Sequence, residues 1–208
     1  LTFFDDPSTI EDMSTHTRKQ REVCEREVKL LNVARCMLIE QGFAGLNMDR
    51  LADATEYSKG TVYQHFRCKE DLVAALAVQS SEQRLALIER ARQFAGRPRE
   101  QMLAIVVADE LFARLHPHYF CSELVIKMAN LEDRASDERR ETLRRIDRTV
   151  FGWLVAIVQA AVGGDDLCLE APRTAESIVF AMFAQIVGTH TAIRNYGEIV
   201  KTLKIKAP

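Results

Sequence analysis

The sequence predicts an all-α protein, and three observations lead to that prediction. Alternating apolar and polar stretches around Asn-Gly or Asp-Gly turns, which are typical of β-hairpins, are absent. Glycine and proline are sparse, at 9 and 5 residues, and several of them punctuate the chain where periodic segments end. Apolar residues recur at the helical spacing of 3.6. At 208 residues the chain can bury a sizeable core without disulfides, so we expect helices packed on helices.

The first two helices are predicted from their apolar spacing and their ends. One covers about residues 21–41, and Gly42 supplies a left-handed stop. Residues 1–20 before it form an acidic-to-mixed tail that we expect to be disordered or partly helical. The next helix begins after Asn47, whose side chain is a good N-cap, and it is short.

The stretch SKGTVYQHF, residues 58–66, predicts a third helix with two distinct faces. Ser58 is an N-cap by type, and Val62 and Phe66 are four residues apart on the buried face. A helix this short has to be held by the preceding one across a tight turn, which is a helix-turn-helix. On the opposite face we expect Thr61, Gln64 and His65 to project together.

In a helix-turn-helix the second helix lies in the DNA major groove. Lys59 and Lys69, near the two ends of the segment, are suited to phosphates, and Tyr63 brings a phenol that reaches a phosphate oxygen. Gly60 allows close approach to the sugar-phosphate edge, and Gln64 can bond adenine bidentately. The pattern therefore predicts DNA binding.

The run LNMDRLADATEYSKGTVYQHFRCKEDL, residues 46–72, resembles the DNA-binding signature of the tetracycline-repressor (TetR) family, as does the VARCMLIEQGF before it. The resemblance covers about residues 26–75. It implies that Asn47 caps its helix beside the DNA backbone and that Lys69 begins a connecting helix beside a phosphate. The predicted DNA contacts are Asn47, Ser58, Lys59, Gly60, Thr61, Tyr63, Gln64, His65 and Lys69.

Two residues depart from the family pattern. Glu56 stands where a glycine is usual in the turn, so a residue with a Cβ has to adopt positive φ at a cost of about 1 kcal/mol. Cys68 stands where a serine often caps the next helix, and a thiol is a poor cap. Both departures are expected to weaken DNA binding without removing the fold.

The remaining helices are predicted from apolar spacing and breaks. The fourth begins at Lys69 and continues to about Phe94, and further helices are expected at about 98–116, 118–130, 135–162 and 172–195, with a last one from Glu198. The predicted domains are residues 21–68 for the helix-turn-helix and 69–208 for helical ligand binding and dimerisation, with no flexible linker. Charged residues from Asp133 to Arg148, including Arg139, are interpreted as a solvated helix face.

Two properties are expected of the larger domain. Residues 175–195 are apolar on nearly all sides and need a partner, and the resemblance implies a homodimer through the last long helices, with Gly188 allowing close contact. Apolar and aromatic stripes with a few polar groups also predict a small-molecule cavity for a hydrophobic or amphipathic effector. Its candidate lining residues are Phe112, Tyr119, Met128, Trp153, Phe183 and Gln185.

Other function classes find little support. His116, His118 and Cys121 are metal-ligand types, but no fourth ligand is evident, so we expect a helix corner, no metal, no cofactor and no enzyme. Five scattered cysteines without a CxxC fit a reducing cytosol. The apolar run 150–162 is too short to span a membrane, and an acidic start is unlike a signal peptide.

Charge supports a local interaction surface. Net charge is -2, and only residues 14–70 lean basic, so a polyanion would meet a patch of this protein. We interpret the chain as a cytoplasmic, ligand-responsive transcriptional regulator, a repressor that binds a palindromic operator as a homodimer. The alternative is an all-helical protein-interaction module whose DNA-reading head is weakened.

Overall fold

The structure is a computed structural model that describes residues 7–116, 122, 125, 126 and 131–195. Within these residues the chain is helical, without strands, as the sequence predicts. Contacts group the chain into two compact units, residues 1–78 with 121–140 and residues 79–120 with 141–208, which are described separately. The helices with printed bounds are α1 (Pro7–Gly45), α2 (Met48–Thr55), α3 (Lys59–His65), α4 (Lys69–Ala91), α5 (Pro98–Leu115), the 3-10 helix η1 (Leu131–Arg134), α7 (Asp137–Gly163) and α8 (Ala175–Asn195).

The first unit begins with a longer helix than the sequence predicts. α1 starts at Pro7, so a start near Arg21 is wrong. Ion pairs one turn apart, from Arg18 and Arg26 to Glu22, stabilise this exposed polar part, which has no apolar stripe to reveal it. Gly42 has φ 66°, so the left-handed stop is confirmed.

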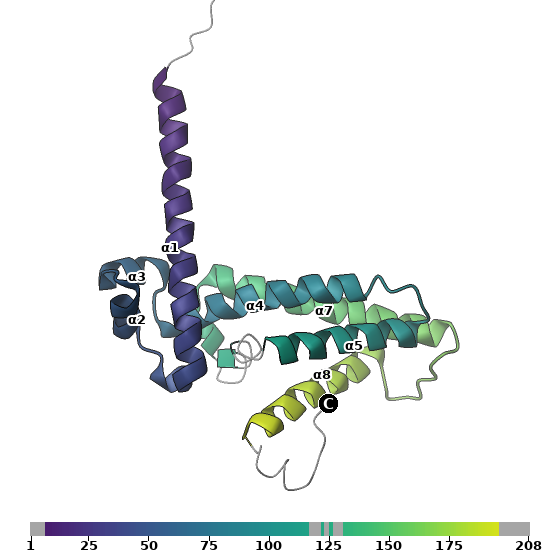
Figure 1. Ribbon diagram of the computed structural model, residues 1–208. Coiled ribbons are helices and arrows are strands. Elements are labelled where there is room, and N and C mark those ends of the chain that lie inside the picture. Colours follow the sequence, from purple (N-terminus) through teal and green to yellow (C-terminus); the bar gives the residue numbers. More distant parts are fainter. Residues whose placement is uncertain (1–6, 117–121, 123–124, 127–130, 196–208) are drawn as a thin grey trace, which may run out of the picture. The chain divides into compact units, whose positions relative to one another are not determined.

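α2 and α3 lie beside the C-terminal half of α1 (Figure 1). Apolar residues from all three helices form the core of this unit. Because the side chains at the contact are fully buried, the two short helices are held by tertiary packing and not by their own stability. Wholly buried apolar residues in or next to these three helices include Leu30, Ala34, Leu51, Val62 and Phe66.

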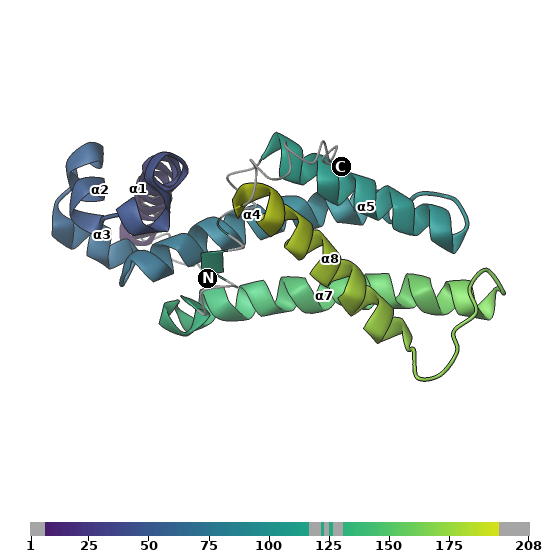
Figure 2. The ribbon, with the colours of Figure 1, turned by 90° about the horizontal axis from the view of Figure 1, so that it is seen from below.

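The second unit contains the later part of α4, α5, most of α7, and α8, which crosses α7 (Figure 2). One core cluster joins Ile88, Ile105 and Val150, and the other joins Val158, Ala175 and Val179. The helix ends lie within three residues of the predicted ones, since Pro98 and the loop before residue 175 interrupt the pattern. The predicted helix 118–130 falls mostly outside the described residues, and the one from Glu198 wholly outside them.

α7 is charged in its first half and apolar in its second. Among the described helices it is the one long and apolar enough to cross a membrane, although only 28% of its apolar window is buried within the chain. Core helices of soluble proteins pass the same test. Its charged first half and its buried positions Leu143, Ile146 and Val150 favour a helix packed against other helices.

Candidate nucleic-acid interface and an enclosed cavity

Side-chain caps position α2. The Asn47 side chain accepts hydrogen bonds from the backbone N–H of Asp49, at 2.8 Å, and of Arg50, at 3.4 Å. At the other end Glu56 has φ 60° and ψ 28°, and its N–H bonds the carbonyls of Ala52 and Asp53. The left-handed conformation expected of Glu56 is therefore confirmed, and its backbone cost is partly offset by this C-cap.

α3 presents a buried face and an open face. Ser58 Oγ accepts the Thr61 N–H at 3.1 Å and lies 2.9 Å from the Thr61 hydroxyl, so the predicted N-cap is confirmed. Val62 is fully buried, whereas Tyr63 is 50% exposed and Gln64 is also exposed. A rigidly held helix thus offers polar side chains to whatever lies outside it.

Gly60 is not required by the protein's own packing. A Cβ built there would meet nothing closer than Ser58 Oγ, at 3.7 Å, which is an ordinary contact. Glycine near a helix start lowers helix stability relative to alanine by up to about 1 kcal/mol.

His65 departs from the predicted face. Its side chain is only 8% exposed, and Nδ1 lies 3.7 Å from a carboxylate oxygen of Glu27 on α1. The expectation that it projects with Thr61 and Gln64 is wrong, because its position in the last turn of α3 turns it toward α1. His65 therefore connects α3 to α1 and does not belong to the exposed face of α3.

The two lysines have partners within the protein. Lys59 Nζ lies 2.7 Å from Asp49, and this hydrogen bond raises the pKa of Lys59 although the lysine is exposed. Lys69 Nζ donates to the Phe43 carbonyl at 3.3 Å and lies 4.3 Å from the Phe43 ring centroid. Lys69 therefore provides a hydrogen bond to a carbonyl in the last turn of α1. Its ammonium group is only partly available to a phosphate.

An open groove joins the start of α2 to the end of α3. Tyr63 lies on one wall, and two exposed arginines, Arg50 and Arg67, line it as well. Neither arginine was among the predicted contacts, although Arg67 directly follows Phe66 and Arg50 lies in the first turn after the Asn47 cap. The groove residues are Ala44, Gly45, Leu46, Asn47, Met48, Asp49, Arg50, Tyr63, Arg67, Cys68 and Lys69.

Arg139, in the first turn of α7, binds the last residue of α3. Its guanidinium donates to Asp71 at 2.7 Å and to the His65 carbonyl at 3.3 Å, and it lies 5.1 Å from the Phe66 ring centroid. The side chain is only 19% exposed, so the interpretation of Arg139 as part of a solvated face is wrong. Charge alternation along α7 gave no sign of a partner 68 residues earlier.

Asp71 is the buried carboxylate in this cluster, with 1% exposure. Burial alone would raise its pKa, but hydrogen bonds from Arg139 and from the N–H groups of Ser136 and Arg67 lower the pKa below the usual value. At the adjacent cap position Cys68 Sγ lies 3.5 Å from the Arg134 carbonyl, and burial raises the pKa of this thiol. The Asp71 carboxylate thus links the start of α4 to the turn before it and to Ser136 and Arg139.

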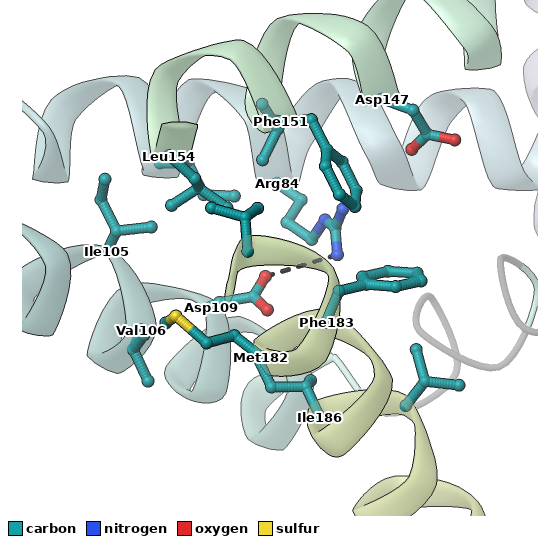
Figure 3. Close-up of a pocket in the computed structure, with 14 residues that line it drawn as sticks. Arg84, Ile105, Val106, Asp109, Asp147, Phe151, Leu154, Met182, Phe183 and Ile186 are labelled. Carbon is teal, nitrogen blue, oxygen red and sulfur yellow. Dashed lines mark ion pairs between the residues drawn. The ribbon is translucent and has the colours of Figure 1, made fainter. Parts of the chain in front are cut away.

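The second unit encloses a cavity of about 60 Å³ between α4, α5, α7 and α8 (Figure 3). Its walls are mainly apolar, with a buried ion pair in which Arg84 Nη1 lies 3.4 Å from Asp109 Oδ1. Phe151 and Phe183 contact edge to face, with centroids 5.5 Å apart. The lining residues are Arg84, Ile88, Ile105, Val106, Asp109, Asp147, Val150, Phe151, Leu154, Val179, Met182, Phe183, Ile186 and Val187.

Of the predicted cavity residues, Phe183 lines this space and three others do not. Phe112 is buried beside His116, Trp153 packs under the Arg92 guanidinium, and Gln185 is exposed on the other side of α8. Apolar spacing could not tell which side of a helix faces a void. Tyr119 and Met128, like the metal-type residues His118 and Cys121, lie outside the described residues.

Residues 30–76 match the family model of the bacterial regulatory proteins of the tetR family. The HTH-type transcriptional regulator UidR of Escherichia coli K12 is 36% identical over 67 residues, which is 32% of this chain and 34% of UidR. The chain thus spans about a third of the length of the curated relatives it matches. The residues matched by the family model lie within the first unit and include α2 and α3.

Solved structures extend the similarity to the fold of most of the chain. A tetR-family protein of Rhodococcus RHA1 has a TM-score of 0.66 at 17% identity, covering 80% of this chain and 83% of that one. AibR, solved in complex with isovaleryl coenzyme A and operator DNA, has a TM-score of 0.61 at 17% identity, covering 80% and 86%. Residues 30–76 thus carry the signature of the tetR family of bacterial regulatory proteins, and most of the chain shares the fold of these solved structures.

Proposed function

We propose that this protein is a cytoplasmic DNA-binding transcriptional regulator, acting as a repressor whose grip on operator DNA responds to a small molecule. The observation that carries the proposal is the two-faced α3. Val62 and Phe66 lock one side into the unit, while Tyr63 and Gln64 remain exposed beside the open surface at Gly60. Such a helix fits the major groove.

The proposed contacts combine reading and anchoring. Thr61 and Gln64 face base edges, and Tyr63, Ser58, Lys59 and the N-terminal cap at Asn47 face the backbone. Arg50 and Arg67 add phosphate contacts from the groove. Asp49 and Glu56 place acids near this surface, so the affinity depends on these cations more than on net charge.

A salt titration tests this assignment. Fluorescence anisotropy with a duplex selected from random sequence is expected to show nanomolar-range binding that falls steeply with salt. Tyr63→Ala is expected to weaken binding without lowering the melting temperature, because Tyr63 is half exposed. Arg67→Ala is expected to reduce the salt slope by about 1.

Exposed Glu170→Gln, in the second unit, is the matched control and should change nothing. Unchanged affinity for the Tyr63 variant would contradict the proposed face. Failure to bind any duplex at low salt would favour the alternative, a protein-interaction module with a weakened reading head.

We also propose a homodimer formed through α7 and α8. Phe180 is 64% exposed on α8, and built Cβ atoms at Gly152 and Gly188 meet nothing within 4 Å, so both helices leave apolar or small surface uncovered. A second copy would bury this surface, including the apolar part of α7. Two-fold symmetry then matches a palindromic operator with half-sites about 34–36 Å apart.

Sedimentation velocity tests the dimer. The wild type is expected to sediment as a dimer, and Phe180→Glu as a monomer that keeps its helical circular dichroism. A monomeric wild type at micromolar concentration would contradict the proposal.

We propose that an effector acts on DNA binding through the two helices that contribute residues to both units. α4 and α7 each contribute residues to both units, with Asp71 and Arg139 in the first and Arg84 and Phe151 at the cavity. A ligand that prefers one arrangement of these helices shifts the DNA-binding equilibrium by its difference in affinity. The complex of AibR with operator DNA and isovaleryl coenzyme A supports assigning both partners to this fold.

A further inference from the structure

We propose that Arg139 of α7 is a positioning residue for DNA reading, which holds the C-terminal end of α3 in the orientation that base recognition needs. The inference rests on the proposed DNA-binding function and adds to it a residue outside the helix-turn-helix. Three observations carry it: the contacts of one guanidinium, the shortness of α3, and the place of the contact on that helix.

The Arg139 guanidinium contacts three other helices of the first unit. Nη1 donates to Asp71 Oδ2 at the start of α4, at 2.7 Å, and Nη2 donates to the carbonyl of His65, the last residue of α3, at 3.3 Å. Nη2 also lies 3.5 Å from Glu27 Oε1 on α1. Because the donors of a planar guanidinium are fixed relative to one another, these contacts define one orientation of the group. Arg139 thereby fixes the end of α3 relative to α1 and α4.

The carboxylate that anchors Arg139 is itself held in place. Asp71 Oδ1 accepts the Ser136 N–H at 2.8 Å, and Oδ2 accepts the Arg67 N–H at 3.1 Å. The side chains of Asp71 and Arg139 are 1% and 19% exposed, so water and salt screen the pair little. The guanidinium therefore has a fixed anchor at the start of α4.

α3 depends on contacts of this kind because it is short. It has 7 residues, whereas isolated helices below about 12–15 residues are marginal in water. Ser58 caps its start, and Val62 is buried at its middle. The last carbonyls of a helix have no partner within that helix. Arg139 supplies a donor to one of them, and its positive charge lies where the helix dipole favours it.

The contact lies next to the exposed face of α3. His65 directly follows Tyr63 and Gln64 in the sequence, so a tilt of this end would move both exposed side chains. Hydrogen bonds to base edges depend on distance and direction, whereas phosphate contacts carry no sequence information. Loss of the Arg139 contact is therefore expected to weaken binding to a specific duplex and to spare non-specific binding.

Fluorescence anisotropy on the full chain tests this role with two duplexes of equal length, one selected from random sequence and one unrelated. Arg139→Met keeps an apolar side chain beside the Phe66 ring and loses the donors. Its affinity for the selected duplex is expected to fall about tenfold, the size of one base contact, with the affinity for the unrelated duplex and the salt slope unchanged.

Two further variants complete the series. Arg139→Lys keeps the charge beside Asp71 but lacks the planar fork, so an intermediate loss of about threefold is expected for the selected duplex. Arg148→Met removes an exposed arginine of the same helix and is the matched control, with both affinities unchanged.

Hydrogen exchange without DNA gives an independent measurement. The backbone amides of residues 63–66 are expected to exchange faster in Arg139→Met than in the wild type, with those of α2 unchanged. Unaltered exchange at the end of α3 would overturn the inference.

The ratio of the two DNA affinities separates positioning from general stability. A folded Arg139→Met with the wild-type ratio overturns the inference, and so does an equal loss for both duplexes, which would indicate a contribution of charge or stability alone. If Arg139→Met loses its circular dichroism, Arg139→Lys decides by the same ratio. A wild type that binds neither duplex contradicts the proposed DNA-binding function itself, whereas an unchanged ratio beside a discriminating wild type contradicts only the role of Arg139.

Discussion

Each unit contains a buried arginine–aspartate pair, and the two pairs differ in how well they are satisfied. In the first unit Asp71 receives a 2.7 Å hydrogen bond from Arg139 and two further backbone hydrogen bonds. In the second, Arg84 and Asp109 are 3.4 Å apart and one carboxylate oxygen accepts no hydrogen bond within the described residues. A fully hydrogen-bonded buried pair stabilises the structure more than one that leaves a buried polar atom without a hydrogen bond.

The difference follows from what surrounds each pair. Asp71 lies in the first turn of α4, where N–H groups of the Arg67–Cys68 turn and of Ser136 point at it. Asp109 lies in the middle of α5, where the helix's own backbone N–H groups are already used. Asp71 is also the more deeply buried, at 1% exposure against 16% for the Asp109 side chain, and its place at a helix start gives it donors at no extra cost.

The largest expected effect comes from removing each carboxylate. Asp71→Asn should destabilise the fold by about 3 kcal/mol, since it removes the nearer and more buried of the two carboxylates that Arg139 contacts, the other being Glu27. Asp109→Asn should cost about 1 kcal/mol, because it breaks a long contact and Asp147 remains nearby. Urea unfolding followed by circular dichroism measures both, and equal losses would remove the distinction between the pairs.

Acid should sharpen the same distinction. The pKa of Asp71 is lowered in the folded state, so its contribution to stability is complete above the ordinary aspartate pKa of about 3.9 and disappears as pH falls through the folded value. Wild-type stability should therefore decline steeply in acid. In Asp71→Asn this decline should be shallower, as measured by urea midpoints at a series of pH values; a parallel decline would contradict the role of Asp71.

A smaller gain in stability is expected from a substitution at Glu56, which adopts positive φ in the first unit. Glu56→Gly should stabilise the protein by up to about 1 kcal/mol, since glycine adopts φ 60° without a Cβ penalty. It also removes an acid beside the DNA surface, so affinity for a duplex should rise. A melting temperature that falls on this substitution would show that the Glu56 side chain has a structural role.

The smallest stability effect is expected at Gly60. Gly60→Ala should leave the unfolding free energy unchanged or slightly higher, because the new Cβ has room and alanine favours helices. Anisotropy titrations should nevertheless show weaker DNA binding, since the methyl group occupies the approach surface. Unaltered DNA affinity would mean that this side of α3 does not approach the duplex closely.

Local signals predicted the first unit well. Asn47, Ser58 and Gly42 are recognisable from residue type and position, because caps and left-handed stops act over three or four residues. The opposed faces of α3 follow from the spacing of Val62 and Phe66, and the conformation of Glu56 from its place in the turn. The start of α1 was missed because a polar helix stabilised by ion pairs lacks an apolar period.

Contacts between residues far apart in the sequence could not be predicted from local sequence patterns. Nothing near Arg139 indicated that it would reach Asp71, and His65 looked like its exposed neighbours until α1 was placed beside it. The cavity residues show the same limit. Phe183 lines the cavity and Trp153 and Gln185 do not, although the three are alike as candidates by residue type, and only the packing of the helices separates them.

The amino-acid sequence by itself determined the all-helical class, the helix-turn-helix, the N-cap of α3 and the buried face of that helix. These features depend on interactions within a few residues. Tertiary structure alone decided which charges are buried, which pair is left unsatisfied and where space remains. Those outcomes depend on which distant side chains meet, and a one-dimensional pattern of apolar and polar residues does not contain that information.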